Sequence, residues 1–287
     1  MFATAGKSFL ASAAFLAASI VAFIVAFLGL FCAGFVQKVA AQASIPDLSS
    51  HSAAWIAINR DFLAVPGSPP PPSNDPAHPY VLNGTRGQQP TYRVADLTNP
   101  NIKPWAKERM KQANEVVLAG GVGYTARSSC MPAGVPDFMM FVVEPIFFVQ
   151  SPKEVLMIFQ GDMQVRHIYL DVPHSQAPKP SWYGESVGHY EGDTLVIDTV
   201  GLNDRTTIDN FRTPHTEKLH VVERWRLVEG GRELEVLIRI DDPDTFYQPW
   251  SAIQRYRRIQ QALPEEVCAE NNAHSEYHMP IADKADF

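Results

Sequence analysis

The chain has 287 residues, of which 24 are Lys or Arg and 31 are Asp or Glu, and its formal net charge is −7. This length fits one sizeable domain or two small ones, and an apolar content of 46% allows a hydrophobic core, which excludes wholesale disorder. The acidic balance and the lack of any basic run argue against a nucleic-acid partner, because such a partner requires a basic face that neutralises phosphates.

The N-terminal part has the pattern of an export segment. Residues 8–37 contain no charged side chain and consist mainly of Leu, Ala, Phe, Val and Ile. A run of about 20 apolar residues spans a bilayer, and the following Ala41-Gln42-Ala43 has the small residues that a signal peptidase accepts. Two interpretations stay open: residues 1–43 are a long cleaved signal peptide, or residues 8–37 are an uncleaved membrane anchor. Both place the rest of the chain outside the cytoplasm, as a periplasmic or secreted protein.

Cleavage after residue 43 would remove Cys32, one of the three cysteines, and leave Cys130 and Cys268. Two cysteines in an exported protein can form a disulfide. It would close a loop of over a hundred residues and contribute roughly 4–5 kcal/mol in the chain-entropy model. The alternative is two separate buried thiols.

Residues 44–130 are expected to form an irregular, Pro-rich extension with one helix. Seven of the fourteen residues from 66 to 79 are Pro, which excludes a helix or a central strand there, because proline lacks the amide donor. The helix is expected over residues 101–118, where Pro104 lies near the start and Gly120-Gly121 follow the end.

The main domain is expected at residues 131–262, followed by a C-terminal tail at residues 263–287. Segments rich in β-branched and aromatic residues alternate here with turn sequences, which predicts about eight strands. They span residues 142–149, 154–160, 163–170, 186–190, 194–200, 218–228, 233–241 and 252–259. Parallel pairing would require crossover helices, which the pattern lacks, so the sheet is expected to be antiparallel. The predicted fold class is mainly β, an antiparallel up-and-down barrel with an interior pocket, and a sandwich is the second choice.

Two carboxylates interrupt the apolar alternation of these strands. Glu223 shares a face with Val221 and Trp225, and Asp198 shares a face with Val196. A carboxylate on a buried face costs several kcal/mol unless it is paired. Each carboxylate is therefore either paired with an arginine or part of the lining of a polar cavity.

The loop at residues 201–220 carries the densest set of polar side chains. Histidine next to a carboxylate suits general acid–base catalysis, because imidazole titrates near neutrality. The candidate catalytic residues are His215, His220, Asp204, Asp198 and Glu223. A divalent metal stays an alternative, but the HExxH, HxH and paired-Cys spacings are absent, so neither a metal site nor an organic cofactor is predicted.

The sequence Gly184-Glu185-Ser186-Val187-Gly188 matches the G-x-S-x-G elbow of serine hydrolases. In that elbow the serine lies between a strand and a helix. A strand and a hairpin are expected here instead, so Ser186 is not predicted to be a nucleophile.

Two functions are therefore weighed. The first is an exported barrel that binds a small apolar or amphipathic ligand in its interior. The second is a cofactor-independent acid–base hydrolase, lyase or isomerase that uses the histidines and carboxylates named above. The partner is a small molecule in both, and a membrane is contacted only through an uncleaved N-terminal segment. The candidate ligand-binding residues are aromatic or polar: Arg166, Tyr169, Trp182, Tyr190, Asn203, Trp225, Tyr247 and Trp250.

Two motifs resemble a large, mostly uncharacterised family of exported bacterial proteins. The family pattern is G-x-W-E-G-D-T-L-V-V-D-T-x-G-F-N-D followed by P-H-S-x-x-L-H-V-V-E-R. Residues 188–204 and 214–224 match it except at four positions, where Tyr190 replaces Trp, Ile197 replaces Val, Leu202 replaces Phe and Thr216 replaces Ser. The start at residues 47–49, followed by Trp55, is similar to the entry of lipocalin-like barrels. The resemblance implies an exported protein with a lipocalin-like barrel, and it implies no particular activity.

Overall fold

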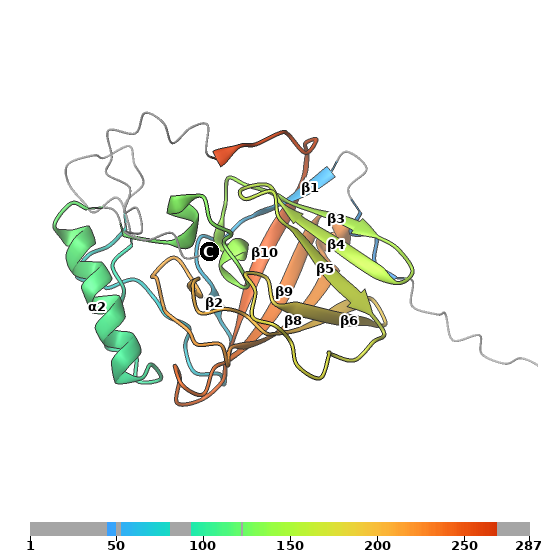
Figure 1. Ribbon diagram of the computed structural model, residues 1–287. Coiled ribbons are helices and arrows are strands. Elements are labelled where there is room, and N and C mark those ends of the chain that lie inside the picture. Colours follow the sequence, from blue (N-terminus) through green and yellow to red (C-terminus); the bar gives the residue numbers. More distant parts are fainter. Residues whose placement is uncertain (1–44, 50–52, 81–92, 122, 269–287) are drawn as a thin grey trace, which may run out of the picture. The chain divides into compact units, whose positions relative to one another are not determined.

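The computed structural model describes residues 45–49, 53–80, 93–121 and 123–268, and the predicted export segment lies outside these ranges (Figure 1). The described part is mainly β and contains a closed barrel of nine strands, one outer strand and one α-helix. No helix in the described ranges is long and apolar enough to cross a membrane.

The barrel strands pair in chain order, and β1 closes the barrel by pairing with both β3 and β10. Closure protects the backbone hydrogen-bonding groups at the edges of the sheet. The outer strand β2 (Leu63–Ala64) pairs with β10. The nine barrel strands are β1 (Ala53–Ala57), β3 (Ile146–Gln150), β4 (Glu154–Phe159), β5 (Val165–Leu170), β6 (Glu185–Glu191), β7 (Thr194–Val200), β8 (His220–Val228), β9 (Glu233–Asp241) and β10 (Trp250–Gln260).

The predicted strands are present as β3 to β10, but the prediction of an eight-stranded, wholly antiparallel barrel is wrong on two points. The ninth strand, β1, comes from the segment that was expected to be irregular. In addition, β5 and β6 pair in parallel, over residues 168–170 and 186–188. The barrel is therefore mixed, and residues 171–184 make the crossover without a helix.

Large side chains fill the space in which an interior ligand pocket was expected. The ring centroids of Phe148 and Trp225 lie 5.6 Å apart, and those of Trp225 and Tyr256 lie 5.5 Å apart. The 3-10 helix η3 (Asp137–Met140) also packs here, and its Met139 carbonyl accepts hydrogen bonds from Gln254 Nε2 at 3.0 Å and the Tyr256 hydroxyl at 3.3 Å. Aromatic packing of this kind makes the barrel interior a hydrophobic core.

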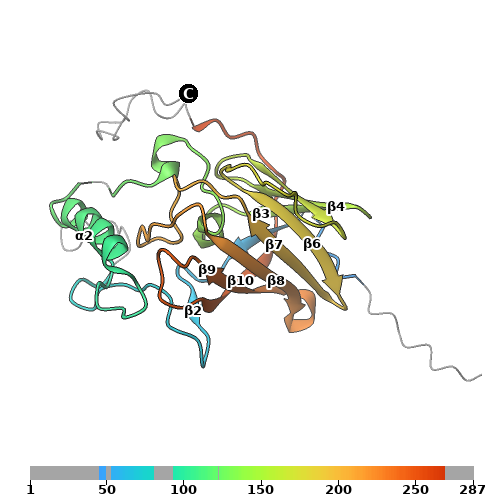
Figure 2. The same cartoon turned by 60° about the horizontal axis from the view of Figure 1, so that its bottom comes forward.

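The predicted helix is present as α2 (Pro104–Leu118), which lies to one side of the barrel in both views (Figures 1 and 2). Proline in its first turn needs no amide donor, and the helix buries Ala106, Met110, Asn114 and Val117 at helical spacing. The buried Asn114 side chain exchanges hydrogen bonds of 2.8 and 2.9 Å with the backbone of Ala95. These bonds fix the helix to the segment that precedes it.

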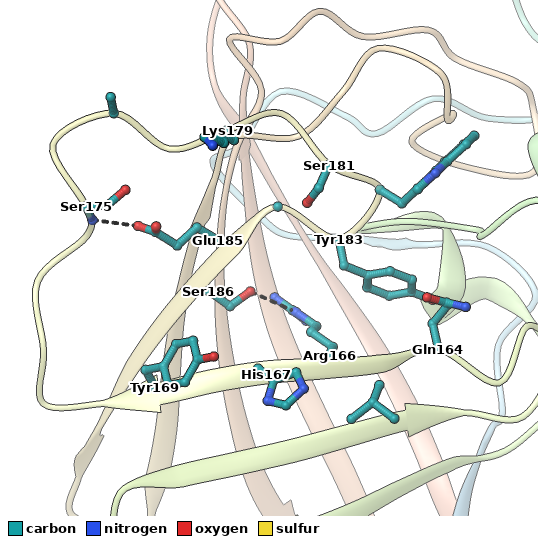
Figure 3. Close-up of a pocket in the computed structure, with 14 residues that line it drawn as sticks. Gln164, Arg166, His167, Tyr169, Ser175, Lys179, Ser181, Tyr183, Glu185 and Ser186 are labelled. Atoms are coloured by element: carbon teal, nitrogen blue, oxygen red, sulfur yellow. Dashed lines mark hydrogen bonds between the residues drawn. The ribbon is translucent and has the colours of Figure 1, made fainter. Parts of the chain in front are cut away.

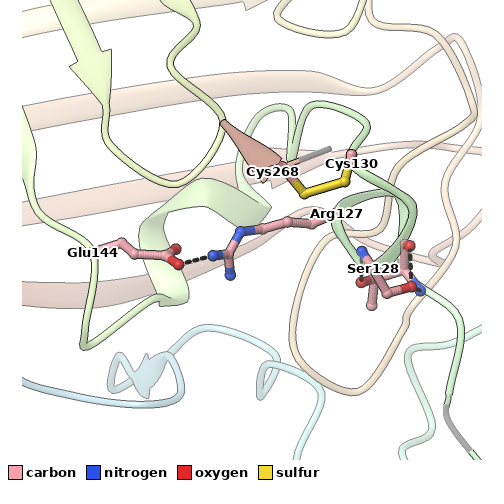
Figure 4. The surroundings of a disulfide bond; sticks show 6 residues. Arg127, Ser128, Cys130, Glu144 and Cys268 are labelled. Carbon is pink, nitrogen blue, oxygen red and sulfur yellow. Dashed lines mark hydrogen bonds and ion pairs between the residues drawn. A yellow bond between two sulfur atoms is a disulfide. The ribbon is translucent and has the colours of Figure 1, made fainter. Parts of the chain in front are cut away.

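The predicted disulfide between Cys130 and Cys268 is confirmed (Figure 4). It joins the residue after the 3-10 helix η2 (Ala126–Ser129) to the segment that follows β10. Arg127, which is close to the bond in sequence, forms an ion pair with Glu144. The bond therefore connects two parts of the chain that are 138 residues apart in sequence.

Candidate functional site

The parallel pairing of β5 and β6 opens a pocket in the barrel wall. The two strands pair over three residue pairs, beginning at Ile168 and Ser186, and they diverge toward their N-terminal ends (Figure 3). The gap between them is a pocket of about 600 Å³. A crossover connection rather than a hairpin therefore creates this site.

One side of the pocket is β5 and the other side is the connection at residues 171–184, with the first residues of β6 behind. Its aromatic, hydroxyl and charged side chains are the mixture that ligand-binding pockets commonly contain. We call it the β5–β6 pocket. Its lining consists of Gln164, Val165, Arg166, His167, Tyr169, Ser175, Ala177, Lys179, Ser181, Trp182, Tyr183, Gly184, Glu185 and Ser186.

The inner end of the pocket rests on a buried ion pair. Arg166 donates to both carboxylate oxygens of Glu223, at 2.8 and 3.0 Å, to Ser186 Oγ at 3.0 Å and to Thr199 Oγ1 at 2.7 Å. Trp225 Nε1 donates to Glu223 Oε2 at 2.8 Å. All five side chains are buried. Glu223 is thus paired with an arginine, and the pocket has a rigid, charge-balanced floor.

Ser186 has no catalytic environment. Its hydroxyl accepts from Arg166 and lies 2.9 Å from Thr199 Oγ1. No histidine hydrogen-bonds Ser186 among the residues that the structure describes. Ser186, the serine of the G-x-S-x-G sequence, therefore helps to position Arg166 in the pocket floor.

Tyr183, which the sequence did not single out, is held as a neutral phenol. Its hydroxyl donates to Asp162 Oδ2 at 2.8 Å, and its ring centroid lies 5.9 Å from that of Phe138. Burial raises the pKa of Tyr183 well above its usual value, and the charge and hydrogen bond of Asp162 raise it further. The side chain can therefore present an apolar ring to a ligand in the β5–β6 pocket.

A group of two histidines and two carboxylates lies beside the pocket, and we call it the His174 cluster. His174 Nδ1 lies 3.0 Å from Glu185 Oε1, and His174 Nε2 lies 3.0 Å from Asp198 Oδ1. His220 Nε2 lies 2.8 Å from the same Asp198 oxygen. The sequence pointed to Asp198 and His220 but missed His174 and Glu185, which come from the crossover and the start of β6.

The contacts of the His174 cluster shift the pKa of three of its groups. The hydrogen bond to Asp198 raises the pKa of His220. Burial alone would raise the pKa of Asp198, but the hydrogen bonds from the two histidines lower it overall. Hydrogen bonds from Ser175, whose amide lies 2.7 Å from the carboxylate, lower the pKa of Glu185. Both carboxylates of the cluster are therefore ionised at neutral pH.

The five candidate catalytic residues do not share one cavity. Glu223 is in the floor network, whereas Asp198 and His220 are in the His174 cluster. His215 is buried in its loop, where Nδ1 donates to a backbone carbonyl at 3.1 Å and burial lowers its pKa. Asp204 lines a different pocket, of about 620 Å³, beside α2. The structure therefore places these five residues at separate locations, because strand order and loop paths hold them apart.

The candidate ligand-binding residues also divide by location. Tyr190 hydrogen-bonds Gln150 at 2.8 Å, Asn203 accepts from a backbone amide in its own turn at 3.1 Å, and Tyr247 is 62% exposed away from the pocket. Trp225 belongs to the barrel core, and Trp250 is buried beside Phe62 and Phe246. The candidates that line the β5–β6 pocket are Arg166, Tyr169 and Trp182.

Within the described residues, no group of three or more His, Cys, Asp or Glu side chains is arranged to hold a metal ion. No protein-family model matches the chain, and a search among curated proteins finds no similar sequence. The geometry of the β5–β6 pocket is therefore the basis for an inference about function.

Proposed function

We propose that this protein binds a small amphipathic molecule in the β5–β6 pocket. The observation that carries the proposal is the opening of about 600 Å³ between two strands that pair in parallel and then diverge. Ligand pockets commonly have volumes of about 300–1,000 Å³. Because packed side chains occupy the barrel interior, the proposal assigns the ligand to the wall of the barrel.

The lining indicates the class of ligand. Tyr169, Trp182 and Tyr183 offer flat apolar surfaces to a ring or a short alkyl chain. Lys179 and Ser181 add hydrogen-bond donors, and the ammonium group favours an acidic substituent. A ligand with an apolar body and an acidic or hydrogen-bonding group matches this mixture.

The wider proposal is a periplasmic or secreted protein with a lipocalin-like barrel and no organic cofactor. The disulfide supports export, because such bonds persist in oxidising compartments. The consecutive antiparallel strands from β6 to β10 support the likeness to lipocalin-like barrels. Membership of the bacterial family rests on the two sequence motifs.

A ligand screen with two tyrosine variants tests the proposal. Native mass spectrometry and thermal shift of the full chain would use a panel of aromatic and alkyl carboxylic acids. Tyr169→Ala should weaken binding of a hit by about tenfold, since one aromatic contact is worth roughly 0.5–1.5 kcal/mol beyond its area. Tyr247→Ala, a matched exposed tyrosine outside the pocket, should leave binding unchanged. A hit that Tyr169→Ala does not affect, or the absence of any hit, contradicts the proposal.

An acid–base enzyme is a second proposal, and one observation favours it. Glu185 lines the β5–β6 pocket and hydrogen-bonds His174, so a carboxylate and an imidazole lie where they could act on a substrate in the pocket. Hydrolysis of ester substrates that falls at least tenfold in Glu185→Gln, but not in the exposed Glu191→Gln, would support it. Equal rates in the two variants would contradict it.

A further inference from the structure

A few polar contacts fix one wall of the β5–β6 pocket to the barrel. Residues 172–180 of the crossover form this wall together with its end at residues 181–184. In the described structure, the hydrogen bonds from residues 172–180 to the barrel come from His174 and from Ser175. The far end is fixed separately, because the Ser181 amide donates to the Gly201 carbonyl at 3.0 Å. Figure 3 shows this connection arching from β5 around the pocket, with Ser175 bonded to Glu185.

The contacts of His174 require a particular protonation state. Each ring nitrogen lies 3.0 Å from a carboxylate oxygen, that of Glu185 or that of Asp198. An ionised carboxylate only accepts hydrogen bonds, and a neutral imidazole has a single N–H group. The neutral ring therefore leaves one nitrogen lone pair facing a carboxylate oxygen. Only the imidazolium donates in both directions, so this geometry fits a protonated His174.

The charges of the cluster lead to the same state. With both histidines protonated, two cations balance Glu185 and Asp198, whereas neutral histidines leave two uncompensated carboxylates within hydrogen-bonding distance of the rings. Two charges of β9 also act on His220, and they oppose each other: Asp241 favours its protonation and Arg239 disfavours it. The hydrogen bond that the Ser175 backbone N–H donates to Glu185 has a donor that does not titrate. Histidine is the side chain whose charge commonly changes between about pH 5 and 8, so protonation of the imidazole rings decides whether the two carboxylates are balanced.

We propose that His174 is an acid-stabilised latch that holds residues 172–180 against β6 and β7 and thereby keeps the wall of the β5–β6 pocket in its binding geometry. Mild acid closes the latch, and alkaline pH releases it. The consequence for ligand affinity rests on the proposed function, because a preordered wall lowers the entropy cost of binding. The effect is moderate, since the His174 and Asp198 side chains are 24% and 38% exposed and solvent screens their charges.

Hydrogen exchange of the full chain tests the latch without any ligand. Protection factors for residues 171–184 would be compared at about pH 5.5 and about pH 8, with correction for intrinsic exchange rates. They should be about three- to tenfold higher at the acidic pH. His174→Gln can bond one carboxylate but cannot titrate, so it should abolish the pH dependence. The control His189→Ala, which removes an exposed histidine of strand β6 outside the cluster, should retain it. Protection that is independent of pH, or that responds equally in His174→Gln, overturns the proposal.

A second measurement separates the latch from the pocket. Binding of anilinonaphthalene sulfonate, an amphipathic aromatic anion, would be measured by fluorescence at the same two pH values. Tighter binding at the acidic pH, by about three- to tenfold and only with His174 present, supports control of the pocket by the latch. If this probe and the acid panel do not bind while protection still depends on pH, the proposed function fails and the latch stands. Affinity that does not change while protection does overturns the coupling.

Discussion

Replacement of Glu223 by glutamine should destabilise the barrel by about 3–5 kcal/mol, which is the usual cost of breaking a buried ion pair. Arg166 and Glu223 are 2% and 0% exposed and share two hydrogen bonds of 2.8 and 3.0 Å. Glutamine keeps an oxygen for Trp225 Nε1 and for one guanidinium N–H group, so the main loss is the negative charge. The buried guanidinium then lacks its counter-charge, because Ser186 and Thr199 offer only neutral oxygens.

The double variant Arg166→Met, Glu223→Leu separates charge from packing. Removal of both charges leaves Ser186 and Thr199 bonded to each other at 2.9 Å. Trp225 Nε1 loses its acceptor, which costs about 1–3 kcal/mol. The double variant should therefore be less destabilised than Arg166→Met alone or Glu223→Leu alone, as expected for two strongly coupled residues.

Urea denaturation followed by tryptophan fluorescence would measure these differences, with the slope on denaturant checked for constancy. The control Glu191→Gln breaks an exposed pair between Glu191 of β6 and Arg224 of β8, so its effect should be far smaller than that of Glu223→Gln. The assignment of a charge-balanced pocket floor would be refuted if Glu223→Gln lowered the free energy of unfolding by less than about 1 kcal/mol. It would also be refuted if the double variant lost as much free energy of unfolding as Arg166→Met and Glu223→Leu lose together.

Three further predictions concern other parts of the fold. The double variant Cys130→Ser, Cys268→Ser should lower the free energy of unfolding by about 4–5 kcal/mol in the chain-entropy model, since the disulfide joins residues that are 138 apart in sequence. In thermal denaturation, the wild-type protein in reductant should unfold at the same temperature as this double variant. Burial, with the nearby charge of Asp209, raises the pKa of Asp137 to about 8. The folded state therefore binds this proton more tightly than the unfolded state, and the free energy of unfolding should fall as pH rises from about 4 to 8. Asp137→Asn should flatten this slope in urea titrations. Gly184→Ala should destabilise by about 1–3 kcal/mol and impair the pocket, because φ is +63° and a Cβ atom would lie 2.5 Å from the Val200 carbonyl oxygen; unchanged urea midpoints would contradict this.

Local alternation was enough to predict eight barrel strands, because each buries one face and ends at a turn sequence. The ninth, β1, was missed because its five residues adjoin a Pro-rich segment and have no local partner. Residue Ala53 of β1 pairs with Gln260 of β10, about two hundred residues further along the chain. Such a pairing depends on the closure of the whole barrel, which no local pattern encodes.

The parallel pair was missed for a related reason. Parallel neighbours usually require a helical crossover, and residues 171–184 contain Pro173, Pro178 and Pro180 but no helix pattern. The connection is long enough to return along the barrel wall in an irregular path. Because the pocket lies where this pair diverges, its position could not be inferred from residue types alone.

The G-x-S-x-G match gains a structural explanation from the same feature. Gly184 adopts a positive φ where the crossover enters β6, and Ser186 accepts from Arg166 in the pocket floor. At Gly188, a Cβ atom would lie 2.9 Å from Ile168 Cγ2 and 2.8 Å from the Val196 carbonyl oxygen, so glycine permits close approach of β5 and β7. The letters shared with the serine-hydrolase elbow thus correspond here to the backbone turn, the arginine contact and the tight packing of a lateral pocket beside a parallel strand pair.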